Sequence, residues 1–340
     1  MQTRQDFARE LTALRERASL TVRDVARAVG EPSSTVGGYF SGRHLPPLKP
    51  PDQLRNILQV CGVTDQAVID EWLETLNRVR RMPGPRSADT AIPYRGLASF
   101  QPDDAGWFYG REKLVDVVIG HLRELHAGGD AGGLLFVVGP SGSGKSSLLR
   151  AGVIPALRSG ALGVAGSADW PVVLFTPGAE PSQELARQLA QVSPAGSGRV
   201  LVVDQFEEVF TACPDDRERA AFIQALCYAA WSGALVVLGL RADFYSRALR
   251  YPELVPALQH RQVVVGPMTE AELRSAITEP ARKARLEIEP GLVEVLLRDL
   301  APAAGEAGPA YESGSLPLMS HALLTTWERA SRGRLTTADY

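Results

Sequence analysis

The sequence predicts an α/β protein: a parallel sheet covered by helices, preceded by an all-α domain and followed by a helical lid. Short runs rich in Val and Leu alternate with helical segments between Gly133 and Gly266, which is typical of buried parallel strands. Before residue 82 and after residue 266, apolar residues instead recur at helical spacing. These two patterns together set the fold class.

Composition limits the classes of partner. The chain has 340 residues, of which 45% are hydrophobic and 22% charged, and its formal net charge is −3. This charge gives no general attraction to nucleic acid or anionic membranes, so any DNA contact must come from a local patch. No apolar run is long enough to cross a bilayer and the polar start is no signal peptide, so we expect a cytoplasmic protein without membrane contact. The three scattered cysteines are interpreted as packing residues: Cys61, Cys213 and Cys227.

Residues 1–82 are expected to form the all-α domain. The segment "TVRDVARAVG" (21–30) and the segment "PSSTVGGYFSGRHL" (32–45) resemble the first and the recognition helix of a Cro-type helix-turn-helix, with Gly30 at the turn. The recognition segment offers polar groups for phosphates or base edges, although Gly37-Gly38 weakens the helix: Ser33, Ser34, Thr35 and Arg43.

The charge of this domain leaves its partner open. Through Arg81 it has 12 Lys and Arg against 10 Asp and Glu, a balance of +2. DNA-binding domains usually show a stronger basic footprint. Two roles therefore remain equally supported for this domain: binding DNA, or acting as an adaptor that binds another protein. A linker rich in proline and small residues, 83–93, separates this domain from the rest.

The core domain is expected over residues 94–266. Its strands are predicted at "GLLFVV" (133–138), "PVVLF" (171–175), "RVLVVD" (199–204), "ALVVLGL" (234–240) and "RQVVV" (261–265). The stretch after the first strand matches the phosphate-binding pattern G-x-x-x-x-G-K-[ST], with the required strand before it and helix after it. We therefore expect a P-loop NTPase sheet.

The residues of this loop have distinct expected roles. Backbone N–H groups would surround the phosphates, Lys145 would reach the β- and γ-phosphates, and the Ser146 hydroxyl would hold Mg²⁺. The expected cofactors are ATP or ADP and Mg²⁺. The nucleotide-binding loop comprises Gly139, Pro140, Ser141, Gly142, Ser143, Gly144, Lys145, Ser146 and Ser147.

Carboxylates at the end of a second strand complete the predicted site. Asp204 follows the run "RVLVV" and is expected to position the metal. Glu207 and Glu208 come next, and either could be the general base, with Glu208 the first choice. Solvated acids at a helix start are the alternative for both. About 60 residues separate Lys145 from Asp204 and hold the "PVVLF" strand, which predicts a sheet with an inserted central strand.

A third strand ends in "LGLRADF", which puts Arg241 at the same edge of the sheet. Its guanidinium is expected to sense the γ-phosphate. The alternative is a structural ion pair with Asp243 or Asp204. Residues 267–340 then form the helical lid: Thr269 and Glu272 have capping-box spacing, and a final helix is expected from about Leu316 to Ala330.

With these motifs in this order, the chain from Tyr94 to Tyr340 resembles the bacterial novel STAND group of signalling P-loop NTPases. Four stretches carry the resemblance: "YRGLASFQPDDAGWFYGRE", "GPSGSGKSSLLRAGVIPAL", "RADFY" and "GSLPLMSHAL". The resemblance implies that Gly110, Arg111 and Glu112 form a GRE motif beside the nucleotide. It also implies that Pro317 in the lid touches the base.

The resemblance further implies a slow ATPase that acts as a molecular switch in signalling or defence. Its nucleotide state would control homo-oligomerisation and the helix-turn-helix output or adaptor domain. A winged-helix region would start near the end of the lid, and the sensor repeats that normally follow would be missing from this chain. The alternative is a DNA-binding transcriptional regulator with nucleotide as a structural ligand. A kinase or transporter ATPase is disfavoured, since the sequence has no "LSGGQ"-like signature and no acceptor-substrate site.

Overall fold

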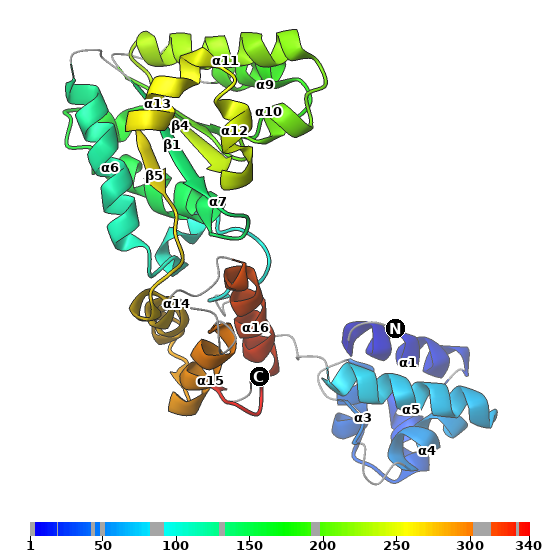
Figure 1. Cartoon of the computed structure of the whole chain (residues 1–340). Helices are drawn as coiled ribbons and strands as arrows, with labels where there is room; N and C mark the ends of the chain where they lie inside the picture. The colour runs from blue at the N-terminus through cyan, green and yellow to red at the C-terminus, as the bar shows by residue number, and fades with distance from the viewer. Residues whose placement is uncertain are drawn as a thin grey trace. The chain divides into compact units, whose positions relative to one another are not determined.

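The computed structural model describes residues 4–18, 20–41, 45–47, 52–81, 92–128, 133–191, 198–301, 314–330 and 333–340. The chain forms two compact units, Met1–Ala91 and Ile92–Tyr340, and each is described by itself (Figure 1). Within the described ranges, none of the helices has the length and apolarity that crossing a membrane requires.

The first unit consists of helices around one apolar core. They are α1 (Arg4–Arg17), α2 (Val22–Val29), α3 (Ser33–Phe40), α4 (Asp52–Val60) and α5 (Gln66–Arg81). A capping box between Thr21 and Asp24 starts α2, and Gly30, with φ of 72°, ends it. Gly30 suits this place because glycine has no Cβ to oppose a positive φ. The helix-turn-helix order predicted from the sequence is therefore present in α2 and α3.

The core of the first unit explains why α3 forms despite its two glycines. Val36 on α3 is fully buried together with Val25 of α2, Ile57 of α4 and Leu76 of α5. Burial of such side chains contributes about 1.5–3 kcal/mol each, which exceeds the cost of about 1 kcal/mol for a glycine in a helix. Tertiary packing thus outweighs the weak helix propensity.

A five-stranded parallel sheet forms the centre of the second unit. Its strands are β1 (Gly133–Gly139), β2 (Val172–Phe175), β3 (Val200–Val203), β4 (Leu235–Arg241) and β5 (Gln262–Val264). They lie in the order β2-β3-β4-β1-β5, and all pairs are parallel. The α/β fold class and the inserted strand are thereby confirmed.

The inserted strand is β4, although the sequence argument had rested on the segment between Lys145 and Asp204. That segment supplies β2, which lies at the edge of the sheet, whereas β4 pairs with β1 on one side and β3 on the other. The burial of the strands agrees with this order: β4 is buried over its first six residues and β2 is only alternately buried. A strand with neighbours and helices on every side must be apolar throughout.

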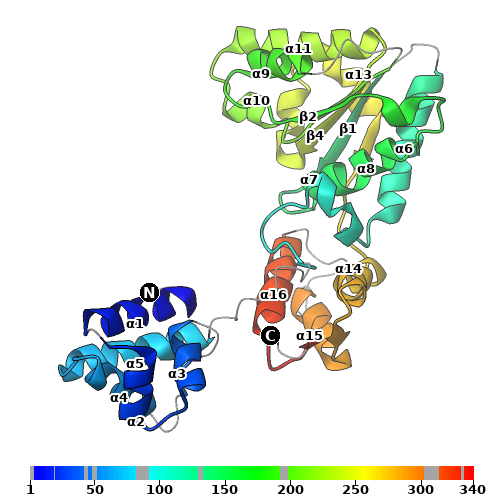
Figure 2. The same ribbon diagram turned by 180° about the vertical axis from the view of Figure 1, so that it is seen from behind.

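Helices cover both faces of this sheet (Figures 1 and 2). On one face, α6 (Glu112–Ala127) packs with the helix after β1, which comprises α7 (Lys145–Ser147), the π-helical turn η2 (Leu148–Val153) and α8 (Ile154–Arg158). The other face is covered by α9 (Pro181–Ala190), α10 (Glu208–Thr211), α11 (Asp216–Trp231), α12 (Tyr245–Ala248) and α13 (Val255–His260). Short 3-10 turns complete the layers: η1 (Pro102–Trp107), η3 (Ser167–Asp169), η4 (Ala242–Phe244) and η5 (Pro252–Leu254).

The C-terminal helices have their own apolar core. They are α14 (Glu270–Lys283), α15 (Pro290–Leu300) and α16 (Ser315–Arg329), accompanied by the paired strands β6 (Glu287–Ile288) and β7 (Arg334–Leu335). The predicted capping box between Thr269 and Glu272 is present at the start of α14. Tyr94 is buried in the same core, and its hydroxyl donates to the Ile277 carbonyl at 2.7 Å. The chain that enters the second unit thus packs first on these helices.

Candidate functional site

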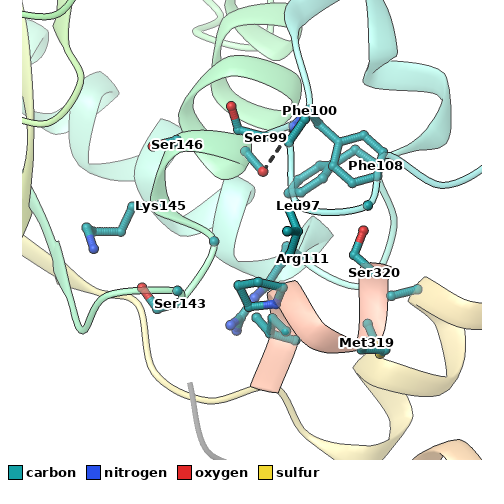
Figure 3. Close-up of a pocket in the computed structure, with 18 of the residues that line it drawn as sticks. Leu97, Ser99, Phe100, Phe108, Arg111, Ser143, Lys145, Ser146, Met319 and Ser320 are labelled. Atoms are coloured by element: carbon teal, nitrogen blue, oxygen red, sulfur yellow. Dashed lines mark hydrogen bonds between the residues drawn. The ribbon is translucent and has the colours of Figure 1, made fainter. Parts of the chain in front are cut away.

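A cavity of about 430 Å³ lies between the sheet edge and the C-terminal helices. Its volume falls in the range of about 300–1,000 Å³ typical of small-molecule sites. In Figure 3, Ser143 and Lys145 of the glycine-rich loop lie on one side of the view and Met319 and Ser320 of α16 on the other. The predicted residues that line it are Arg111, Ser141, Gly142, Ser143, Gly144, Lys145, Ser146, Ser147, Glu207, Arg241 and Pro317.

The loop between β1 and α7 has a backbone that requires glycine. Gly142 and Gly144 have φ of 75° and 87°, which other residues rarely adopt. A Cβ on Gly139 would lie only 2.7 Å from the Val265 carbonyl oxygen. The loop before Lys145 therefore turns tightly beneath the cavity, and Pro140 lies within that turn.

Lys145 lies nearly buried at the base of the cavity. Its Nζ donates to the carbonyl oxygens of Gly139 and Pro140, both at 2.8 Å. Burial lowers the pKa of Lys145, while the nearby Glu207 carboxylate acts in the opposite direction. The Lys145 ammonium is poorly solvated, and its hydrogen-bond partners within the described ranges are neutral carbonyls. An anionic ligand would therefore stabilise its charge more strongly here than at a solvated surface.

Ser146 and Asp204 join the loop to the end of β3. The Ser146 hydroxyl donates to Asp204 Oδ1 at 2.9 Å, and Asp204 is only 1% exposed. A hydroxyl and a carboxylate are the hard oxygen ligands that Mg²⁺ prefers. The described part of the chain has no group of three or more His, Cys, Asp or Glu able to hold a metal. The residues therefore fit a magnesium ion that takes its other ligands from phosphates and water.

Asp204 has a second partner, which the sequence analysis missed. Arg150 on η2 donates to Asp204 Oδ2 from Nε at 2.9 Å, and its Nη2 lies 2.9 Å from the same oxygen. The signal was available: Arg150 comes four residues after Ser146, so both side chains project from one helix face.

The two glutamates after Asp204 point in different directions. Glu207 is 8% exposed, lines the cavity and accepts a hydrogen bond from the Arg241 backbone N–H at 3.2 Å. Glu208 does not line the cavity and instead accepts from the Gly178 backbone N–H at 3.2 Å. The turn carries Gln205 at φ of 55°, in the left-handed region, and this residue also lines the cavity. The geometry favours Glu207 as the candidate general base, whereas the sequence had made Glu208 the first choice.

Burial raises the pKa of Glu207 above its ordinary value of 4.5, although Lys145 and Arg241 oppose this effect. A base with a raised pKa is better matched to proton transfer near neutral pH than an exposed carboxylate. Glu207 therefore combines a position in the cavity lining with a raised pKa, the two features expected of a general base.

Arg241 lines the cavity and is held in an ion pair. Its Nε and Nη2 donate to the two carboxylate oxygens of Asp243 at 3.1 and 2.8 Å, and its guanidinium lies over the Phe244 ring. This is the structural pair that the sequence offered as the alternative to γ-phosphate sensing. The side chain is 39% exposed, so the pair is a weak restraint.

Arg111 and Gly110 lie where the chain passes between the sheet and the C-terminal helices. Arg111 is 7% exposed, its Nη2 donates to the Gly266 carbonyl at 2.7 Å, and burial lowers its pKa. Gly110 has φ of 86°, and a Cβ there would lie 2.3 Å from the Glu272 carbonyl oxygen. Its own N–H donates to the Glu112 carboxylate. These contacts explain the order Gly-Arg-Glu at this place. Pro317 lines the same cavity from the first turn of α16.

The segment before the GRE motif also contributes to the cavity. Its lining residues are Tyr94, Gly96, Leu97, Ala98, Ser99, Phe100, Trp107, Phe108 and Tyr109. The Phe100 backbone N–H donates to the Ser147 hydroxyl at 3.2 Å, and the Phe100 ring packs edge-on against Phe108. Sequence reasoning used this segment only as part of the family resemblance, since it has no periodic or charged pattern of its own.

In the first unit, the candidate nucleic-acid contacts are described in part. Ser33 is exposed at the start of α3 and Thr35 is half-buried. The Ser34 side chain and the whole of Arg43 lie outside the described residues.

Comparison with known proteins gave matches for both units. The family described as "Novel STAND NTPase 1" matches residues 93–340, and the family described as "Helix-turn-helix domain" matches residues 6–72. No curated protein has a significantly similar sequence. Among solved structures, the Aeropyrum pernix ORC1 protein in complex with DNA is similar at 15% identity, with a TM-score of 0.47. That match covers 72% of this chain and 68% of the other.

Proposed function

The chain belongs to the novel STAND NTPase 1 family, and we propose that it is a molecular switch that binds ATP, hydrolyses it slowly and controls an N-terminal helix-turn-helix domain. The observation that carries this proposal is the bond between Ser146 and Asp204 beneath a cavity that also contains Lys145 and Arg241. A cation-binding pair, a phosphate-binding lysine and a second guanidinium at one sheet edge suit a magnesium nucleotide.

Each residue has a role in this proposal. Lys145 exchanges its two carbonyl partners for phosphate oxygens, and Ser146 and Asp204 hold Mg²⁺, which neutralises phosphate charge when bound. Glu207 accepts a proton from the attacking water. Arg241 leaves Asp243 for the γ-phosphate. Arg111 and Pro317, which both line the cavity, enclose the rest of the nucleotide.

The wall formed by α16 supports a switch rather than a simple binding module. The cavity is bounded both by the loop and by Leu316, Pro317 and Met319 of α16, so a bound nucleotide would touch the sheet and the C-terminal helices together. A ligand shifts a conformational equilibrium only through contacts that differ between the states. We propose that ADP favours the closed form and that the ATP γ-phosphate, through Arg241, favours opening and assembly with further copies of the chain.

The central claim has a direct test. The purified chain is denatured, and any released nucleotide is identified by chromatography. ADP or ATP in near-stoichiometric amount is expected. An empty protein that also fails to bind added Mg·ATP in calorimetry would reject the proposal. Phosphate release measured with excess ATP should be slow, and transfer of phosphate to an added acceptor should be absent.

A second candidate, a DNA-binding regulator with nucleotide as a structural ligand, is favoured by the helix-turn-helix match over residues 6–72. Residues 1–82 contain an apolar core of their own and are expected to fold alone. Their affinity for random duplex should be weak and fall steeply with salt, because phosphate contacts release counterions. Tight, salt-resistant binding to one operator together with permanent nucleotide occupancy would favour the regulator over the switch.

A further inference from the structure

Arg150 contacts two parts of the second unit that are far apart in the sequence. Its Nε donates to Asp204 Oδ2 and its Nη2 lies 2.9 Å from the same oxygen. Its Nη1 donates to Gln101 Oε1 at 3.0 Å. The planar guanidinium thus connects the carboxylate at the end of β3 to the residue that immediately precedes η1.

The two oxygens of Asp204 have separate partners. Oδ1 accepts from Ser146, the residue expected to hold the metal, and Oδ2 accepts from Arg150. Metal and guanidinium therefore need not compete for one oxygen. Asp204 is nearly inaccessible, and a buried carboxylate is costly without a charged partner. Arg150 supplies that partner and fixes the rotation of the carboxylate.

Gln101 belongs to a stretch that we call the entry segment, residues 92–104. It is the first part of the second unit, and residues 82–91 join it covalently to the last helix of the first unit. The entry segment lines the cavity with six residues and bonds to the helix after the loop through Phe100 N–H and Ser147. Gln101 itself is exposed and does not line the cavity.

We propose that Arg150 is a positioning residue that couples the Asp204 metal site to the entry segment through Gln101. When a divalent cation fixes the carboxylate, the guanidinium is fixed with it, since its donors have a rigid fork geometry. Gln101 and the backbone around it are then ordered in turn. The proposal rests on the proposed function, because it requires a magnesium nucleotide at Ser146 and Asp204, and it adds the route by which metal occupancy reaches the chain that leads to the first unit.

Hydrogen exchange of the entry segment tests this coupling. The full chain is saturated with ADP, and the exchange rates of the backbone amides of residues 95–104, other than Pro102, are compared with and without Mg²⁺. In the wild type, Mg²⁺ is expected to slow exchange by roughly two- to thirtyfold, the range of coupling energies carried by side-chain networks. Arg150→Lys and Gln101→Ala should each lose most of this slowing. The lysine retains a charge for Asp204 but has no fork with which to reach Gln101 as well.

The controls separate coupling from a loss of binding or of fold. Gln101→Ala should bind Mg·ADP with wild-type affinity in calorimetry, because Gln101 lies outside the cavity. Gln188→Ala, which removes a side-chain amide that donates to Glu184 on α9, should keep the full effect of Mg²⁺. The double variant Arg150→Lys/Gln101→Ala should lose no more than either single variant, as expected for one shared contact.

Two results would overturn the proposal: full slowing retained in Gln101→Ala, or equal losses in Gln101→Ala and Gln188→Ala. A wild-type chain that binds no Mg·ADP in calorimetry would instead overturn the proposed function, and the coupling with it. The binding and exchange measurements therefore distinguish the two failures.

Discussion

The Ser146 hydroxyl donates a 2.9 Å hydrogen bond to Asp204 Oδ1, which links the helix after β1 to the end of β3. These strands are not neighbours, because β4 lies between them. The two side chains therefore meet across the inserted strand, beside Gly239 of β4: a Cβ there would make ordinary contact with Asp204 Oδ1 at 3.6 Å but would lie only 2.9 Å from Leu149 Cδ1.

Asp204→Asn should weaken nucleotide binding mainly when magnesium is present. The amide keeps the size of the carboxylate but removes the charge that would hold the cation, so the gain in ATP affinity on adding Mg²⁺ should shrink on the order of tenfold or more. Calorimetric titration with and without Mg²⁺ measures this gain. Asp169→Asn, at an exposed residue that does not line the cavity, serves as the control. An unchanged magnesium effect in Asp204→Asn would reject the metal assignment.

Lys145→Ala should abolish measurable ATP binding while leaving the fold intact. Among the described residues, its hydrogen-bond acceptors are the carbonyls of its own loop, so its loss removes charge from the phosphate site and little packing. Calorimetry measures the affinity and circular dichroism the fold. Lys113→Ala, which removes an exposed lysine on α6, should bind normally. Wild-type affinity in Lys145→Ala would be incompatible with the loop assignment.

Glu207→Gln should slow hydrolysis more than Glu208→Gln does. Glu207 lines the cavity and Glu208 bonds to Gly178, so we expect only the first to lie close to an attacking water. Loss of a general base typically costs about 10²- to 10⁴-fold in rate. Single-turnover phosphate release, with ATP affinity measured separately, gives the comparison. Should Glu208→Gln be the slower variant, the base assignment must return to Glu208.

The sequence predicted the elements of the fold better than their arrangement. Short runs rich in Val and Leu identified the five strands of the main sheet, and the pattern around Lys145 identified the loop, because local sequence determines both. It could not show that β4, rather than β2, lies between the motif strands, since strand order depends on contacts between distant segments. The sequence also could not show in which directions the Glu207 and Glu208 side chains point, because these directions follow from the turn at Gln205 and from the bond to Gly178.

Glu207→Gln should also raise stability, and more so at higher pH. Burial raises the pKa of Glu207, so the folded state holds its proton more tightly than the unfolded chain does. The stability that depends on this proton is fully present below the unfolded pKa and is lost as pH rises through the folded pKa. Glutamine stays neutral throughout. Melting temperatures without nucleotide, compared at about pH 5 and about pH 8, should show a variant advantage that grows with pH. A pH-independent difference would contradict the burial of an ionising carboxylate.

Arg241→Ala should bind both nucleotides yet lose the response that is specific to ATP. In the structure Arg241 is paired with Asp243, and a partly exposed pair of this kind contributes only about 0.2–1 kcal/mol. A phosphate carries more charge than a carboxylate and accepts from the same guanidinium fork, so a γ-phosphate can displace Asp243. ADP lacks that group and leaves the pair intact. Small-angle scattering and light scattering, with ADP and with a non-hydrolysable ATP analogue, report the change in shape and assembly.

Asp243→Asn provides the opposite perturbation: it weakens the restraint on Arg241, so the ATP response should appear at an analogue concentration lower by up to about fivefold, the equivalent of 1 kcal/mol. If wild type, Arg241→Ala and Asp243→Asn respond alike, Arg241 is only the structural partner of Asp243 and the γ-phosphate is sensed elsewhere.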